Sequence, residues 1–259
     1  MMKKYYLKRC GHQELGSIKE DGDAQRGRYL LVSKKLLDFF PPLTVEQKND
    51  SALLPIIPLY SGNKVYCNFV YHNDKFHGST ARVPRNEFRI YLNNALETGK
   101  RLLAEGDIII IRAHELLEKD GLKQKVFLLD LVQDRQSALY RELNAKIEGS
   151  SINGAYAAYD GIISEFENRV ASVLMSPEPT VVIDTSVTKQ IEKSEPDTLA
   201  GLFNAVSFRD FVMVGYDSLC AVTGLVIKHQ TYMNLEAAHI RPKSHGGLFL
   251  PNNGPCIGA

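Results

Sequence analysis

The feature that most constrains the fold is a series of short apolar segments between residues 5 and 130. They are rich in β-branched or aromatic residues and are separated by Gly, Pro, Asn or Asp, which predicts β-strands joined by turns. The predicted strands are GRYLLVS (27–33), LLPIIPLY (53–60), KVYCNFVY (64–71), EFRIYL (87–92), GDIIIIRA (106–113) and KVFLLDLV (125–132). Many strands at such short spacing predict a barrel or a sandwich.

Helical patterns are rare before Asp134 and frequent after it. We expect a short helix at 36–40, which the prolines at 41 and 42 end, and a second helix over 93–103. After Asp134 apolar residues recur at helical spacing, which predicts two helices. The first contains Leu139, Leu143 and Ile147, and the second contains Tyr156, Tyr159, Ile163, Phe166 and Val170. A later helix is expected around Val206 and Phe211.

These patterns predict an α+β, multidomain protein of 259 residues. Residues 1–135 would form an all-β domain, and residues 136–196 a helical connector and linker, because 176–196 are rich in Ser, Thr, Pro and charge. Residues 197–259 would form a small C-terminal module.

Charge is unevenly distributed along the chain, although the formal net charge is only +1. Residues 1–96 contain 15 Lys and Arg against 9 Asp and Glu, whereas residues 97–259 contain 16 against 21. A polyanion would therefore bind the N-terminal part. The four scattered cysteines are typical of a reducing compartment, and we find neither a signal peptide nor an apolar run that could span a bilayer. We expect a cytoplasmic protein with no membrane partner.

The C-terminal module contains an ordered motif. Its pieces are Cys220-Ala-Val-Thr-Gly224, Leu235-Glu-Ala-Ala-His-Ile240, Pro242, Gly246-Gly247 and Pro251-Asn-Asn-Gly254. This order resembles the HNH nuclease family, in its subgroup with a CxxTG, LEAAHI, GG and NG pattern. The resemblance implies a ββα-metal fold, in which two strands carry a histidine and a loop carries an asparagine.

The resemblance also implies residue roles. His239 would be the general base that takes a proton from the attacking water, with a further role as metal ligand, and Asn253 would hold the metal loop in shape. Mg²⁺ or another divalent metal ion would neutralise charge on the scissile phosphate. Two positions depart from the family pattern: Ala238 stands where many relatives have a ligand, and GPCIGA ends the chain before the expected final helix and its second histidine. We therefore expect an incomplete module that lacks its remaining metal ligand.

A zinc site is an alternative interpretation of the same module. Its ligands would be Cys220, His239, His245 and Cys256. The chain has no Cys-x-x-Cys pair, which is the spacing that most structural zinc sites use.

The segment FVYHNDKFHGSTARVPRNEFRIY (69–91) is the second informative stretch. It interleaves basic residues with asparagines and aromatic residues in a predicted strand–loop–strand. Alternation places Glu87 and Arg89 on one face of the strand and Phe88 and Ile90 on the other. Arg, Asn and Glu side chains suit the base edges of the DNA major groove. Solvated charges on a strand that covers a core would give a similar pattern.

The Asn-Glu-Phe-Arg step after Arg85 resembles the effector-binding domain of the EcoRII restriction enzymes, which has the B3-like pseudobarrel fold of plant transcription factors. The resemblance covers about residues 3–135 and implies two arms that clamp duplex DNA. The C-terminal arm would comprise Arg82, Arg85, Asn86, Glu87 and Arg89, and the N-terminal arm His12, Gln13, Glu14 and Ser17. Lys75, Lys34 and Lys35 would contact phosphates.

Together, the two resemblances predict a type II or modification-dependent restriction endonuclease. It would couple sequence-specific recognition of double-stranded DNA to metal-dependent hydrolysis of phosphodiester bonds. Pairing of two sites would favour a homodimer, and a cognate methyltransferase would belong to the same restriction–modification system. The alternative is a DNA-binding protein without catalysis, either a regulator or a decayed nuclease remnant.

Overall fold

The computed structural model describes residues 3–16, 28–97, 102–118, 121–152, 154–175, 179–193, 203–229, 232–247 and 249–258. Their contacts divide the chain into two compact units, residues 1–180 (unit 1) and residues 181–259 (unit 2). Among the described helices, none combines the length and the apolar character that crossing a membrane requires.

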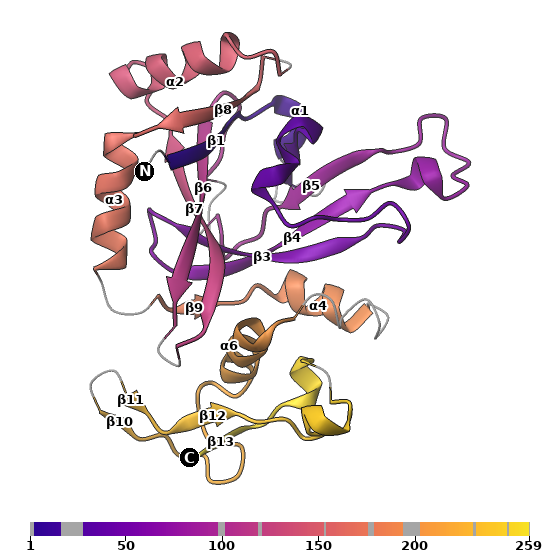
Figure 1. The fold of residues 1–259 in the computed structure, drawn as a ribbon, viewed down its shortest axis with the longest axis vertical. Helices are drawn as coiled ribbons and strands as arrows, with labels where there is room; N and C mark the ends of the chain where they lie inside the picture. The colour runs from indigo at the N-terminus through magenta and orange to yellow at the C-terminus, as the bar shows by residue number, and fades with distance from the viewer. Residues whose placement is uncertain are drawn as a thin grey trace, which may run out of the picture. The chain divides into compact units, whose positions relative to one another are not determined.

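Unit 1 is built on one strongly bent β-sheet (Figure 1). Its strands are β1 (Lys3–Arg9), β2 (Tyr29–Val32), β3 (Ser51–Pro58), β4 (Lys64–His72), β5 (Glu87–Tyr91), β6 (Ile108–Leu117), β7 (Lys123–Val132) and β8 (Tyr156–Gly161). They follow the order β2-β5-β4-β3-β7-β6-β1-β8, and the neighbours are antiparallel except for the parallel pair β3–β7. Each of the six predicted strands is present, which confirms a mostly β architecture for this part of the chain.

The two faces of the sheet are covered differently because neighbouring residues of a strand point to opposite sides. Tyr5 packs against Phe166 of α3 (Ser164–Leu174), in a cluster that also includes α2 (Ala138–Glu148). Tyr6 meets Phe40 from the other face, where an aromatic cluster forms. The whole of β4 is buried, as expected for a central strand that is covered on both sides.

The helix expected through Tyr156 and Val170 is wrong in its first half. Residues Tyr156–Gly161 form β8, which pairs with β1 from Lys8↔Tyr156 to Lys3↔Gly161, and the helix starts only at Ser164. Apolar residues three or four apart suit a helix, but here the free edge of β1 supplies backbone partners that favour a strand.

Residues 136–180 pack within unit 1, so the expected connector at 136–196 is divided between the two units. Three short helices also belong to unit 1: α1 (His12–Leu15), η1 (Lys34–Phe39), which matches the helix expected at 36–40, and η2 (Asp74–Phe76). The helix expected over 93–103 is absent from its described residues, 93–97 and 102–103, where the chain forms turns and irregular structure. Residues 98–101 lie outside the described part.

Unit 2 is a small mixed unit. Its elements are β9 (Val181–Val182), α4 (Thr185–Lys193), α6 (Ala205–Gly215), β10 (Lys228–His229), β11 (Tyr232–Met233), β12 (Leu235–Ala237), η3 (Lys243–His245), η4 (Pro251–Asn253) and β13 (Cys256–Gly258). The helix expected around Val206 and Phe211 is present as α6. Strand β12 pairs antiparallel with β13, and Phe208 and Val212 of α6 pack against this pair (Figure 1).

Candidate functional site

The connection between β4 and β5, residues 73–86, is held closed at its base; we call it the arm loop. The Lys75 N–H donates a hydrogen bond of 3.1 Å to the Arg85 carbonyl oxygen. Arg85 Nε donates to Asp74 Oδ2 at 2.5 Å, and this hydrogen bond lowers the pKa of the Asp74 carboxyl. With both ends tied together, the loop projects beyond the sheet (Figure 1).

Three of the predicted DNA-contacting cations lie on the arm loop. The side chains of Lys75 and Arg82 are exposed, and within the described part of the chain neither has a hydrogen-bond or ion-pair partner. Arg85 is 42% exposed in its side chain although its Nε is bonded to Asp74. The loop therefore presents three positive charges that a ligand can reach.

The first residues of β5 confirm the predicted alternation. Phe88 and Ile90 are buried, whereas Glu87 and Arg89 are half-buried on the opposite face. Arg89 forms an ion pair with Glu87, and its guanidinium lies over the Tyr29 ring at 3.9 Å. Its buried Nε has no hydrogen-bond partner among the described residues. The Tyr29 contact, which the sequence did not suggest, fixes the plane of this guanidinium.

His72 lies beside this pair, because it is the register partner of Glu87 across β4 and β5. Its Nε2 is 2.6 Å from the Tyr91 hydroxyl and its Nδ1 is 3.1 Å from Asn49 Oδ1. Burial, together with the charges of Arg85 and Arg89, lowers the pKa of His72 to about 4. His72 is therefore neutral at neutral pH.

A cavity of about 340 Å³ is lined by the turn after β2 and by the start of β5. Lys34 and Lys35 line it from one side, and Asn86 and Glu87 from the other. Asn86 Oδ1 accepts a 2.9 Å hydrogen bond from the Tyr71 hydroxyl, which orients its amide. The structure thus groups two predicted phosphate contacts with two predicted base contacts.

The residues predicted for the N-terminal arm differ in their exposure. His12 and Gln13 are exposed on α1, and Ser17 lies outside the described residues. Glu14 is not available for DNA, because it is 4% exposed and pairs with the buried Lys8 at 2.7 Å. It also accepts a 2.6 Å hydrogen bond from the Leu31 N–H. Glu14 therefore holds α1 against β1 and β2.

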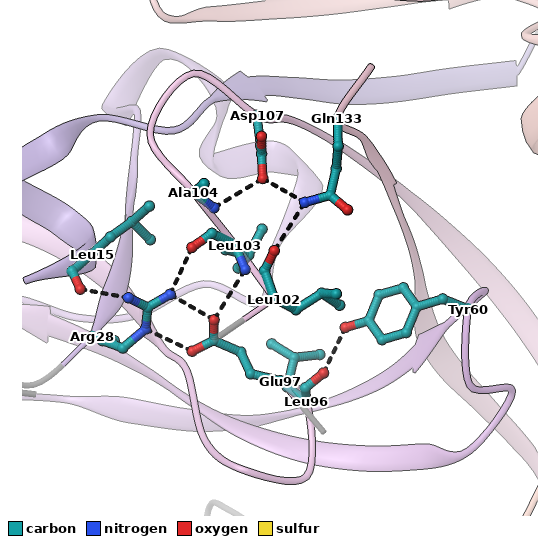
Figure 2. Close-up of polar contacts among 10 residues, drawn as sticks. All are labelled: Leu15, Arg28, Tyr60, Leu96, Glu97, Leu102, Leu103, Ala104, Asp107 and Gln133. Carbon is teal, nitrogen blue, oxygen red and sulfur yellow. Dashed lines mark hydrogen bonds and ion pairs between the residues drawn. The ribbon is translucent and has the colours of Figure 1, made fainter. Parts of the chain in front are cut away.

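Arg28 has a similar structural role, which the sequence analysis did not anticipate (Figure 2). Its guanidinium donates to both carboxylate oxygens of Glu97, at 2.8 and 2.6 Å. It also donates to the carbonyl oxygens of Leu15, at 2.6 Å, and Leu103, at 2.9 Å. Both side chains of the ion pair are at most 10% exposed. Arg28 thereby ties α1 to the segment that follows β5.

In unit 2, His239 lies between two aromatic rings just beyond the end of β12. The Phe208 ring stacks on it with a centroid distance of 4.5 Å, and the Phe249 ring meets it edge-on at 5.0 Å. Its Nε2 is buried and has no hydrogen-bond partner within the described chain. One imidazole nitrogen is therefore buried and unpartnered among the described residues.

Asn253 holds the segment that follows His239. Its Oδ1 accepts a 2.9 Å hydrogen bond from the Arg241 N–H, and its Nδ2 donates to the Arg241 carbonyl oxygen at 3.2 Å. The Ile240 N–H donates to the Asn253 carbonyl oxygen at 2.8 Å. Gly254 follows where a Cβ would lie 2.4 Å from Phe208 Cζ, so the Asn-Gly step also permits close packing beside His239.

The side chains around His239 do not form a recognisable metal site. No group of three His, Cys, Asp or Glu side chains that could hold an ion occurs in the described ranges. Cys220 and Cys256, considered above as zinc ligands, belong to the apolar core of unit 2, and burial raises the pKa of Cys256. His239 contributes one unpartnered nitrogen, and a donor set for a divalent ion is not found around it in the described chain.

Comparisons with known proteins add little to this geometry. No family model matches the chain, and no curated protein matches it. Among solved structures, it is similar to the B3 domain of the UbaLAI restriction endonuclease, crystallised with cognate DNA. The identity is 14%, the TM-score is 0.37, and the match covers 61% of this chain and 87% of that one. At this TM-score the likeness carries no functional conclusion, which must come from the side chains themselves.

Proposed function

We propose that unit 1 binds double-stranded DNA through one surface, which we call the arm surface. It comprises Lys34, Lys35, Lys75, Arg82, Arg85, Asn86, Glu87 and Arg89. The observation that supports the proposal most strongly is the projecting arm loop, whose cations lie next to the ordered Glu87–Arg89 pair. Such a surface combines charges that attract a polyanion with side chains that can distinguish bases.

The residues of the arm surface divide into two kinds. Lys75, Arg82, Lys34 and Lys35 are exposed, which suits contacts with phosphates, although Lys35 Nζ also donates a 3.1 Å hydrogen bond to the Ser151 carbonyl oxygen. Glu87 and Arg89 are half-buried and orient each other, which suits base edges: an arginine donates two hydrogen bonds to guanine, and a glutamate accepts one from cytosine. The paired arrangement keeps both side chains ordered before DNA arrives.

The binding test uses short duplexes selected from a random pool and measured by fluorescence anisotropy. We expect the double variant Lys75→Ala/Arg82→Ala to weaken binding to all duplexes alike. It should also reduce the slope of log K against log salt concentration by about 1.8, because each phosphate contact contributes about 0.9. Arg141→Ala is the matched control, since Arg141 is exposed on α2 outside the arm surface. An unchanged slope in the double variant contradicts the proposal.

A second function, hydrolysis of DNA, is favoured by unit 2. We propose that the β12–β13 pair presents His239 as a general base, because its buried Nε2 has no partner and Asn253 fixes the backbone beside it. Hydrolysis of the HNH type also uses a divalent ion. The described chain does not complete the ligand set for it. DNA binding without hydrolysis is therefore the alternative function of this chain, and the experiment below distinguishes the two.

The hydrolysis test compares the wild-type chain with His239→Ala and His245→Ala on supercoiled plasmid, with and without Mg²⁺. His245→Ala is the control, because its imidazole lies on the exposed turn η3 and bonds only to Ser244 among the described residues. We expect nicking by the wild type and the control but not by His239→Ala, with duplex binding equal in all three. Absence of nicking in every form, with binding retained, assigns DNA binding alone to this chain.

A further inference from the structure

A second positively charged feature lies on unit 1 outside the arm surface. It is a cavity of about 400 Å³, and cations line it from three strands: Lys3 and Lys4 of β1, Arg112 of β6 and Lys125 of β7. Asp38 and Phe39 of η1 complete its lining with Ala113. We call it the basic cavity.

The origin of the cavity is visible in the strand pairing. The ladder between β1 and β6 covers only Tyr6↔Ile111 to Arg9↔Ile108. Beyond Tyr6, β1 continues in register with β8, and β6 continues in register with β7. Because the β1–β6 ladder ends at Tyr6↔Ile111, residues 3–4 and 112–113 do not pair with each other, and they line the cavity. It is therefore a consequence of the sheet topology and not of a surface loop.

The charges around the cavity are not balanced. Glu167 is shared: it pairs with Lys3, lies 3.1 Å from Arg112 Nε, and accepts a 2.6 Å hydrogen bond from the Tyr5 hydroxyl. With Asp38 as the other carboxylate, four cations face two anions. Glu115, the register partner of Lys125, is paired with Lys123, so two positive charges are in excess among the groups that line the cavity.

The individual side chains are poised for an anion. Arg112 is 9% exposed, and its Nη2 donates a 3.5 Å hydrogen bond to Glu167 Oε2. Its Nε–H lies close to Glu167 but has no hydrogen-bond acceptor among the described residues. Lys4 Nζ lies 5.1 Å from the Phe39 ring centroid and Lys125 Nζ lies 5.5 Å from that of Phe127. Within the described chain, neither lysine has a carboxylate partner. A phosphate can accept several charge-assisted hydrogen bonds from such donors at once.

We propose that the basic cavity binds a phosphate group. Its volume lies within the range of small-ligand sites, about 300–1,000 Å³, so a mononucleotide would fit as well as a single backbone phosphate of DNA. Both sources present the same chemistry. The basic cavity and the arm surface have no residue in common.

The test measures the affinity of unmodified and variant protein for AMP by calorimetry and for a short duplex by anisotropy. The double variant Lys4→Gln/Lys125→Gln removes two exposed charges and leaves the core intact. The control is Arg141→Gln, which removes one exposed charge on α2 outside the cavity lining. Circular dichroism checks that each variant is folded.

We expect AMP to bind saturably, and the double variant to weaken that binding by about tenfold or more, with the control within about twofold. If AMP does not bind but the double variant weakens duplex binding by such a factor, the cavity takes a DNA phosphate, which also supports the proposal. If the double variant binds AMP and the duplex as tightly as the unmodified protein does, the proposal is wrong. It is also wrong if the control variant loses as much affinity as the double variant. Loss of duplex binding in Lys75→Ala/Arg82→Ala, with AMP binding retained, separates this site from the arm surface.

Discussion

Arg89 and Arg85 differ in how their guanidinium groups are held, and this difference predicts different responses to substitution. Arg89 is fixed between Glu87 and the Tyr29 ring. Arg85 has one side-chain hydrogen bond among the described residues, from its Nε to Asp74. A fixed planar guanidinium can donate two parallel hydrogen bonds to a guanine, which a lysine cannot reproduce.

We therefore expect Arg89→Lys to lose about 1–3 kcal/mol of binding to the preferred duplex while binding to other duplexes changes little. The charge is retained, so a purely electrostatic role for Arg89 would leave affinity for the preferred duplex unchanged. Lys75→Arg, on the exposed part of the arm loop, is the control and should alter neither affinity. Anisotropy with the preferred duplex and its single-base variants distinguishes these results.

Residue roles could be predicted from the sequence only where a local pattern carried them. The alternation in EFRIY was enough to place Glu87 and Arg89 on one face of β5, and the structure confirms it. Glu14 was assigned to the N-terminal arm, but its partners are Lys8 and the Leu31 N–H. Those contacts depend on how β1 and β2 are brought together, which no local pattern indicates.

At the scale of elements, Arg28 connects α1 to the segment after β5 through one buried guanidinium. A lysine at this position has one ammonium group and cannot reach Glu97 and two carbonyl oxygens together. We expect Arg28→Lys to lower the free energy of unfolding of unit 1 by about 3–5 kcal/mol, because Glu97 would be left buried and poorly paired.

Urea denaturation followed by circular dichroism measures this change. Arg135→Lys is the matched control, since Arg135 is exposed and donates one side-chain hydrogen bond of 2.6 Å to the Glu105 carbonyl oxygen. Equal unfolding midpoints for the two variants would show that the Arg28 ion pair does not stabilise the unit.

Helices and strands were predicted well where the residue types and the spacing of apolar residues both indicated the same kind of element. The six strands between residues 27 and 132 are β-branched or aromatic and bounded by turn residues, and all six are present. The segment 156–161 was predicted helical because Tyr156, Tyr159 and Ile163 fit a helical period. The deciding factor was the unpaired edge of β1, about 150 residues earlier in the chain, which a local reading cannot include.

At the scale of the whole of unit 1, the buried His72 makes stability depend on pH. Its folded pKa is about 4, below its ordinary value of 6.5, so the unfolded chain takes up a proton between pH 6.5 and 4 while the folded chain does not. Stability is therefore lost as the pH falls through this window, by up to about 3 kcal/mol at its lower end.

We expect His72→Gln to reduce the fall in melting temperature between pH 7 and pH 4, because glutamine does not titrate. The exposed His12 provides the control, and His12→Gln should follow the wild-type curve. If the curves of wild type and His72→Gln are parallel, His72 is not the group that couples protonation to unfolding.

The pairing of β8 with β1 also determines where the chain can be divided. A fragment that stops at residue 135 would lack β8, α2 and α3, leaving the outer edge of β1 unpaired and the apolar face around Tyr5 and Leu7 open to water. Bare strand edges beside apolar surfaces recruit other chains and lead to aggregation. The shortest fragment of unit 1 expected to remain monomeric in solution therefore extends to about residue 180, well past the last strand that the sequence predicts.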